Sequence, residues 1–132
     1  INLSDAAQCS YSIIMATEII GLSTAERSII ANVVRYNTVE FTMEDVLTQQ
    51  LRPEDYLVIV KLVAILRVAN ALDRSHKQKF EQVRLILKDA QLEIVVDTSE
   101  DITLEKGLFP PKADYFEEVF HVRPMIRKKK NL

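Results

Sequence analysis

The sequence contains very little glycine, proline and cysteine. Its 132 residues include two glycines, four prolines and one cysteine. This composition excludes collagen-like and low-complexity chains, and two glycines are too few for the usual glycine-rich loop that cradles a nucleotide phosphate. The single cysteine, Cys9, permits no internal disulfide and is typical of a reducing compartment. We therefore expect a cytoplasmic protein.

Recognisable catalytic motifs and membrane segments are also absent. The sequence has no G-x-S-x-G and no H-E-x-x-H, and its two histidines, His76 and His121, cannot assemble a histidine-rich metal centre. No apolar stretch reaches transmembrane length. The formal net charge of −2 gives no general attraction for nucleic acid, so a polyanion site must be a local patch. A first residue other than methionine suggests that the chain is a fragment.

The first two thirds of the sequence predict helices over residues 3–20, 23–37, 42–51 and 53–72. Ser23 and Glu26 have the spacing of a capping box. In the first helix, an apolar stripe that includes Cys9 predicts that this side chain is a small buried hydrophobe and not a nucleophile. The segment 53–72 is apolar on most sides, as expected for the centre of a bundle, although a strand over 57–60 is the alternative.

The last third changes from helical to alternating periodicity. Apolar residues at every second position predict a hairpin with strands over 83–87 and 92–96, followed by a helix over 111–120. A returning strand over 121–126 leaves 127–130 as a basic tail, which is most often solvated. The sequence thus predicts an α+β protein. It divides into a helical bundle, residues 1–79, and a small α+β subdomain, residues 80–132, packed on it.

The most distinctive local feature is a basic cluster at the end of the apolar helix. One interpretation is a polyanion site formed by Arg67, Arg74, His76, Lys77 and Lys79. The alternative is that these cations only stabilise the C-terminal end of a helix, where the macrodipole favours positive charge. Spacing alone favours the alternative.

Several segments, taken in order, resemble the C-terminal region of the exopolyphosphatase/guanosine pentaphosphate phosphohydrolase family. They are Ser-Tyr-Ser-Ile-Ile at 10–14, Ile-Gly-Leu-Ser at 20–23, Ile-Ala-Asn-Val-Val-Arg-Tyr at 30–36, the segment from Leu62 to His76, and Lys-Ala-Asp-Tyr-Phe-Glu at 112–117. The resemblance implies an HD-like helical bundle followed by a small α+β portion. It also implies that catalysis belongs to an N-terminal actin-like phosphatase domain that this chain lacks.

By the same resemblance, the region holds polyphosphate or guanosine pentaphosphate in a basic channel and helps to form a homodimer. The intact enzyme would use a divalent metal such as magnesium. For this fragment alone we expect no cofactor, and neither a membrane nor a specific nucleic acid as a partner. Cys9, Asn37 and Asn70 stand where the family often has histidine, histidine and aspartate. Asparagine is a poor ligand for a divalent ion in place of carboxylate or imidazole, so we expect no catalytic metal centre.

Three hypotheses follow. The first is a non-catalytic accessory domain of an exopolyphosphatase-type enzyme that binds polyphosphate, mediates dimerisation, or does both. The second is a degenerate HD-type, metal-dependent nucleotide phosphohydrolase. The third is a purely structural dimer module in which the basic cluster only stabilises a helix end.

Overall fold

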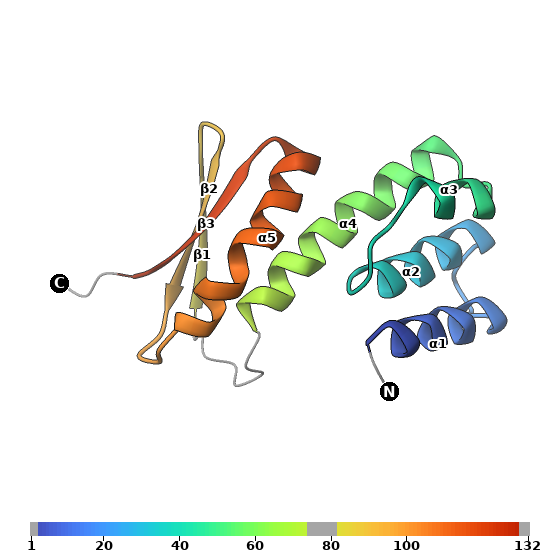
Figure 1. Cartoon of the computed structure of the whole chain (residues 1–132), viewed down its shortest axis with the longest axis horizontal. Helices are drawn as coiled ribbons and strands as arrows, with labels where there is room; N and C mark the ends of the chain where they lie inside the picture. The colour runs from blue at the N-terminus through green and yellow to red at the C-terminus, as the bar shows by residue number, and fades with distance from the viewer. Residues whose placement is uncertain (1–2, 74–81, 130–132) are drawn as a thin grey trace. The chain divides into compact units, whose positions relative to one another are not determined.

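The computed structural model describes residues 3–73 and 82–129, and over these residues the chain is α+β, as predicted (Figure 1). Its elements are α1 (Leu3–Ala16), α2 (Thr24–Tyr36), α3 (Met43–Gln49), α4 (Pro53–Leu72), β1 (Gln82–Lys88), β2 (Gln91–Asp97), α5 (Thr103–Phe120) and β3 (Arg123–Lys128). The chain forms two compact units, Ile1–Val63 and Ala64–Leu132. The predicted domain boundary between residues 79 and 80 lies outside the described residues and stays a prediction, as does the HD-like nature of the bundle.

Helices α2 and α3 both begin at a capping box. The Ser23 hydroxyl accepts a hydrogen bond from the Glu26 amide at 3.1 Å, and the Ser23 amide donates to the Glu26 carboxylate at 3.0 Å. Thr42 and Asp45 make the same reciprocal pair at the start of α3. Each box satisfies amides that have no partner within the helix. The predicted starts of both helices are confirmed.

Helix α1 differs from its prediction in length and in the face that it buries. It ends at Ala16, where the Thr17 hydroxyl donates to the Ile13 carbonyl at 2.7 Å and Arg27 donates to the Thr17 carbonyl at 2.9 Å. The helix packs on α2 and buries Ala7, whereas Cys9 is exposed. The prediction that Cys9 is buried is therefore wrong. The side of α1 that packs on α2 is not the side predicted from the apolar stripe.

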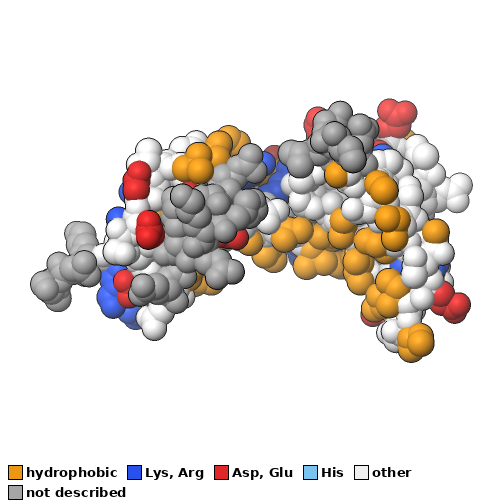
Figure 2. All heavy atoms as spheres, turned by 90° about the horizontal axis from the view of Figure 1, so that it is seen from below, with side chains coloured by type: hydrophobic (Ala, Val, Ile, Leu, Met, Phe, Trp, Pro, Cys, Tyr) orange, Lys and Arg blue, Asp and Glu red, His pale blue; other side chains and the backbone are white. Residues whose placement is uncertain are grey.

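Helix α4 is confirmed as a helix over the stretch where a strand was the alternative. In the first unit its Ile59 and Val63 are completely buried. Leu57, Val58 and Leu62 are about half exposed, at 52%, 42% and 42%, so the helix is not buried on all sides. Figure 2 shows hydrophobic side chains gathered on one face of the helical unit.

The second unit contains a three-stranded mixed sheet in the order β1-β2-β3. Strands β1 and β2 are antiparallel and form the predicted hairpin, whereas β3 lies parallel to β2. Strand β3 continues to Lys128, and the Lys129 amide donates to the Val96 carbonyl at 2.8 Å. The predicted basic tail is therefore wrong for its first residues, which belong to the sheet because the ladder with β2 holds them.

Helix α5 begins at Thr103, well before the predicted start at residue 111, and contains Pro110 and Pro111. Proline removes backbone hydrogen bonds from a helix interior, which is why the sequence favoured a start at Pro111. Burial compensates for this loss: Phe109 and Ala113, one turn apart, are 5% and 1% exposed. The core that they join is formed by Val68, Ala71, Ile94, Val96, Ile102, Phe109 and Ala113.

Candidate functional site

The sheet has one face covered by helix and one face open. Residues in register share a face, and the pairs Leu85–Ile94 and Ile94–Ile126 place the apolar positions of all three strands together. Helix α5 contacts β3 and packs on this covered face. We call the opposite side the open face. Its side chains in β1, β2 and β3 are Gln82, Arg84, Ile86, Lys88, Glu93, Val95, Asp97, Met125 and Arg127, and Lys129 follows in the same alternation.

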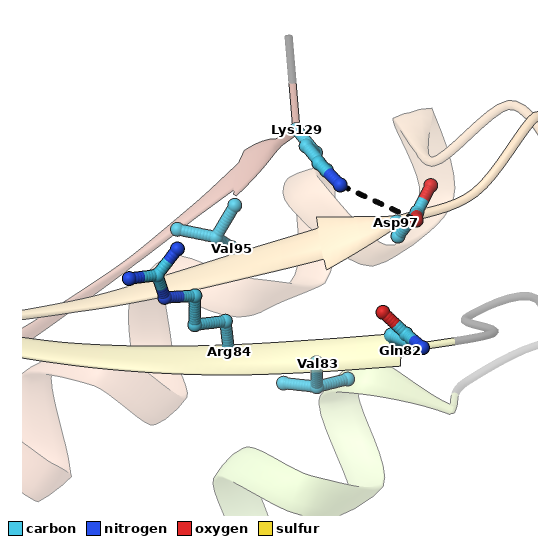
Figure 3. A pocket seen from close by; sticks show the side chains of 6 residues that line it. All are labelled: Gln82, Val83, Arg84, Val95, Asp97 and Lys129. Carbon is cyan, nitrogen blue, oxygen red and sulfur yellow. Dashed lines mark ion pairs between the residues drawn. The ribbon is translucent and has the colours of Figure 1, made fainter. Parts of the chain in front are cut away.

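A shallow pocket of about 470 Å³ lies on the open face. Figure 3 shows Arg84 and Gln82 from β1, Val95 and Asp97 from β2, and Lys129 on the same side of the sheet, whereas Val83 points to the other side. The pocket combines a guanidinium, an amide and an ammonium group with one carboxylate. The guanidinium, amide and ammonium groups can donate hydrogen bonds to phosphate oxygens, whereas the carboxylate of Asp97 repels them.

Cations on the outer strands flank the central strand. The register places Arg84 on one side of Val95 and Arg127 on the other. Adjacent strands lie about 4.8 Å apart, so the two guanidinium-bearing residues start about 10 Å from each other across Val95. Val95 is only 8% exposed. The arrangement forms a track between two rows of positive charge along β2, in which the carboxylates of Glu93 and Asp97 lie on either side of Val95.

The open face has an excess of positive charge. Lys129 forms an ion pair with Asp97 at 4.0 Å, and Arg127 forms one with Glu93 at 3.5 Å. Within the described parts of the chain, Arg84 and Lys88 have no carboxylate partner. Both ion pairs are substantially exposed and contribute little to stability, so their cations remain available to a phosphate group.

Of the five residues predicted to bind a polyanion, the structure describes only Arg67. Its guanidinium lies 4.6 Å from the ring centroid of Tyr115 on α5, a cation–π contact. Arg67 therefore belongs to the helical side of the sheet and is not part of the open face. Arg74, His76, Lys77 and Lys79 lie outside the described residues, so their role stays a prediction.

A pair of amides, one of them completely buried, is the most pronounced polar feature of the helical unit. Asn32 is completely buried and donates to Gln49 at 2.9 Å, while Gln49 donates back to Asn32 at 2.8 Å. Asn32 also donates to the Ser28 carbonyl at 2.8 Å, and the Tyr11 hydroxyl donates to Gln49 at 3.3 Å. The hydrogen bonds satisfy neutral groups among themselves, which indicates a structural role.

An ionisable cluster lies beside this pair. Burial is the main factor that raises the pKa of Tyr36 above its ordinary range, and the nearby Asp45 raises it further. Burial also raises the pKa of Asp45, but hydrogen bonds from Thr42 and Tyr36 outweigh it and hold that pKa below the usual 3.8. Arg35 lies 4.9 Å from the Tyr36 ring centroid. At neutral pH the cluster therefore holds a neutral phenol, a carboxylate and a guanidinium.

Metal ligands do not gather in the described parts of the chain: residues 3–73 and 82–129 contain no group of three or more histidine, cysteine, aspartate or glutamate side chains placed to hold an ion. The expectation that this chain has no catalytic metal centre stays a prediction, because His76 lies between the two ranges. No helix in these ranges is long and apolar enough to cross a membrane.

Sequence reasoning missed the open face and the amide pair. The hairpin alternation already separates Arg84 and Lys88 from the apolar positions, which is a usable signal. The pairing of β3 with β2, which brings Arg127 and Lys129 to the same face, has no comparable signal in the sequence. Asn32 and Gln49 lie in different helices, so their pairing depends on tertiary structure.

The fold and this face define a small α+β domain with a basic, open-faced sheet. The family model described as Ppx/GppA phosphatase, domain III, matches residues 1–109. The chain belongs to this family, which confirms the resemblance seen in the sequence. A search of curated proteins found no match.

Proposed function

We propose that the chain is a non-catalytic accessory domain of a Ppx/GppA-type phosphatase, and that it binds polyphosphate along the open face of its sheet. The observation that carries the proposal is the placement of Arg84 and Arg127 on either side of Val95, with Lys129 beside the same pocket. Membership of a phosphatase family supports a phosphorylated ligand. Guanosine pentaphosphate is the alternative ligand within the same chemistry.

An extended polyanion suits this surface better than a compact metabolite. The cations are spread along two strands and do not converge on one point, and the pocket lies on the open face of the sheet (Figure 3). Affinity would come from the sum of several charge contacts and from release of counterions, so it should fall as salt rises. A polymer offers many equivalent phosphates to such a track.

The predicted residues of the basic cluster remain part of the proposal. Lys79 precedes β1 by three positions in the sequence, and β1 opens with Gln82, which lines the pocket. Arg74, His76, Lys77 and Lys79 stay candidate phosphate ligands on the sequence alone. Arg67, held against Tyr115, would contribute to the electrostatic field on the other side of the sheet.

Charge reversal on the open face tests the proposal. Arg84→Glu combined with Arg127→Glu should weaken binding of long-chain polyphosphate at low ionic strength by at least about tenfold, with a shallower dependence on salt. Binding is measured by titration followed by fluorescence anisotropy. Lys106→Glu combined with Lys61→Glu is the matched control, because it makes the same change in charge at exposed positions outside the sheet. A larger loss of affinity in the open-face variant than in the control supports the proposal. An equal loss of affinity in the two variants contradicts it.

A second pair of substitutions separates the open face from the basic cluster. Arg74→Glu with Lys77→Glu alters the cluster and leaves the open face unchanged. If only this pair weakens binding, the ligand lies on the cluster and the sheet proposal is wrong. If neither pair changes the affinity while folding stays intact, the chain is a structural module.

A further inference from the structure

The cations of the open face fall into two groups, and the group on β3 is already paired. Arg127 forms an ion pair with Glu93 at 3.5 Å, and Lys129 forms one with Asp97 at 4.0 Å. Both carboxylates belong to β2, the central strand. Their side chains are 36% and 40% exposed, so the two pairs are in contact with solvent. The positive charge of β3 is therefore balanced within the sheet before any ligand binds.

The second group, Arg84 and Lys88 on β1, has no such balance. Both residues are exposed, and no carboxylate in residues 3–73 and 82–129 forms an ion pair with either of them. Strand β2 presents Glu93 and Asp97 to the open face, and each of these carboxylates contacts a cation of β3. The two rows of positive charge therefore differ, because the row on β1 is free and the row on β3 is paired.

Arg84 and Arg127 show this difference most directly. The register places both residues opposite Val95, one on each side of β2. They have the same guanidinium group and start from the same position along the central strand. Glu93 forms its ion pair with Arg127 and not with Arg84. The two arginines are therefore a matched pair that differs in the presence of a carboxylate partner.

We propose that Glu93 and Asp97 are built-in counter-ions that set the affinity of the open face for a phosphate chain. The chain binds directly to the free cations of β1, and it reaches the paired cations of β3 only by replacing the two carboxylates. This inference rests on the proposed function, since it concerns the same face and the same ligand. It assigns the two acidic residues a role in tuning that binding, whereas the cations supply the attraction.

The weakness of exposed ion pairs allows this exchange. Such pairs contribute little to stability, and a phosphate oxygen accepts the same charge-assisted hydrogen bonds from Arg127 that a carboxylate accepts. The exchange nevertheless gains less than binding to a free cation, because one pair is lost for each pair formed. The displaced carboxylate also stays near the phosphate and repels it. The two acidic residues therefore lower the affinity of the whole face and keep the ligand releasable.

Two single substitutions compare the free arginine with the paired one. Arg84→Gln and Arg127→Gln remove the same group from opposite sides of Val95. Because Arg127 must give up Glu93 to bind phosphate, its loss should weaken binding of long-chain polyphosphate about two- to fivefold less than the loss of Arg84, the range expected for one exposed ion pair. Fluorescence anisotropy of the full chain at low ionic strength measures both affinities. Equal losses overturn the inference.

The same two substitutions in a Glu93→Gln background test the cause of the difference. Neither arginine then has a carboxylate partner, so Arg84→Gln and Arg127→Gln should weaken binding equally. A difference that persists in this background overturns the inference, because it cannot come from Glu93. Circular dichroism confirms that each variant is folded before it is titrated.

Removal of both carboxylates should strengthen binding and its dependence on salt. Glu93→Gln combined with Asp97→Asn lets the cations of β3 contact phosphate without exchange. By analogy with single-stranded nucleic acid, the slope of log Kd against log salt should steepen by about 0.7 for each added contact. Glu40→Gln combined with Glu118→Gln is the matched control, since it makes the same change in net charge at exposed positions outside the sheet. No steepening, or equal steepening in the control, overturns the inference.

These outcomes are distinguishable from a failure of the proposed function. A wild-type chain that binds polyphosphate, and in which the two arginine substitutions have equal effects, leaves the proposed function intact and overturns only the role of the two carboxylates. A wild-type chain that does not bind at low salt contradicts the proposed function and overturns this inference with it.

Discussion

Replacement of Phe109 with alanine is expected to destabilise the second unit by about 3–5 kcal/mol. Phe109 is 5% exposed and joins Ile94 and Val96 of β2 to helix α5 in a single core cluster. Its removal loses the burial of an aromatic ring and leaves a cavity that the surrounding strands and helix fill only in part. Urea unfolding followed by circular dichroism measures the loss as a shift in the transition midpoint.

Leu108→Ala is the matched control for this prediction. Leu108 precedes Phe109 in α5 and is 39% exposed, so truncation to alanine there should cost about 1 kcal/mol or less. Because Pro110 and Pro111 follow directly, the comparison also tests whether α5 is one continuous helix before and after the prolines. A helix that started at Pro111 would leave Phe109 in a loop, and the two substitutions would then have similar effects.

Loss of either member of the Asn32–Gln49 pair is expected to destabilise the helical unit by about 1–3 kcal/mol. Asn32→Leu keeps the approximate volume but leaves the amide of Gln49 without the partner that it now has at 2.8 Å and 2.9 Å. Gln49→Leu leaves the completely buried Asn32 without its side-chain partner in the same way. A buried polar group without a partner carries its full cost of desolvation.

The double substitution distinguishes this account from a general loss of packing. With both amides replaced by leucine, no group of the pair is left unsatisfied, so the double variant should be less destabilised than the sum of the two single variants. Urea unfolding of all four proteins gives the coupling free energy. Strict additivity would show that the two amides do not depend on each other and would contradict the buried pair.

Features determined by neighbouring residues could be predicted from the sequence. The capping boxes at Ser23 and Thr42 act within one turn, and the hairpin depends on alternation within two adjacent strands. The box at Ser23, the helix that starts at Thr42 and the hairpin were predicted, and all three are confirmed. The apolar length of α4 likewise outweighed its β-branched residues and correctly favoured a helix.

Features that depend on distant partners could not be predicted in the same way. The buried side of α1 is set by α2, which moves the packed stripe to Ala7 and leaves Cys9 exposed. The start of α5 depends on the burial of Phe109, which outweighs the local effect of two prolines. Strand β3 reaches Lys128 only because β2 lies beside it.

The same distinction explains the outcome for the candidate site. Arg84 is separated from the apolar positions of β1 by simple alternation, so the part of the open face that β1 contributes could be predicted from the sequence. Arg127 and Lys129 read as a solvated tail until the parallel register with β2 brings them opposite Val95 and Asp97. The positive charge of the open face comes from two separate segments, so it could be found only with the sheet topology.

The central claim is that this domain holds a phosphate polymer without cleaving it. The most direct measurement is titration of the wild-type chain with long-chain polyphosphate at low and high salt, with released phosphate assayed in the same samples in the presence of magnesium or manganese. We expect binding at low salt that weakens as salt rises, and no release of phosphate above the protein-free blank. Absence of binding at low salt would contradict the binding claim, and metal-dependent release of phosphate would show instead a degenerate HD-type phosphohydrolase.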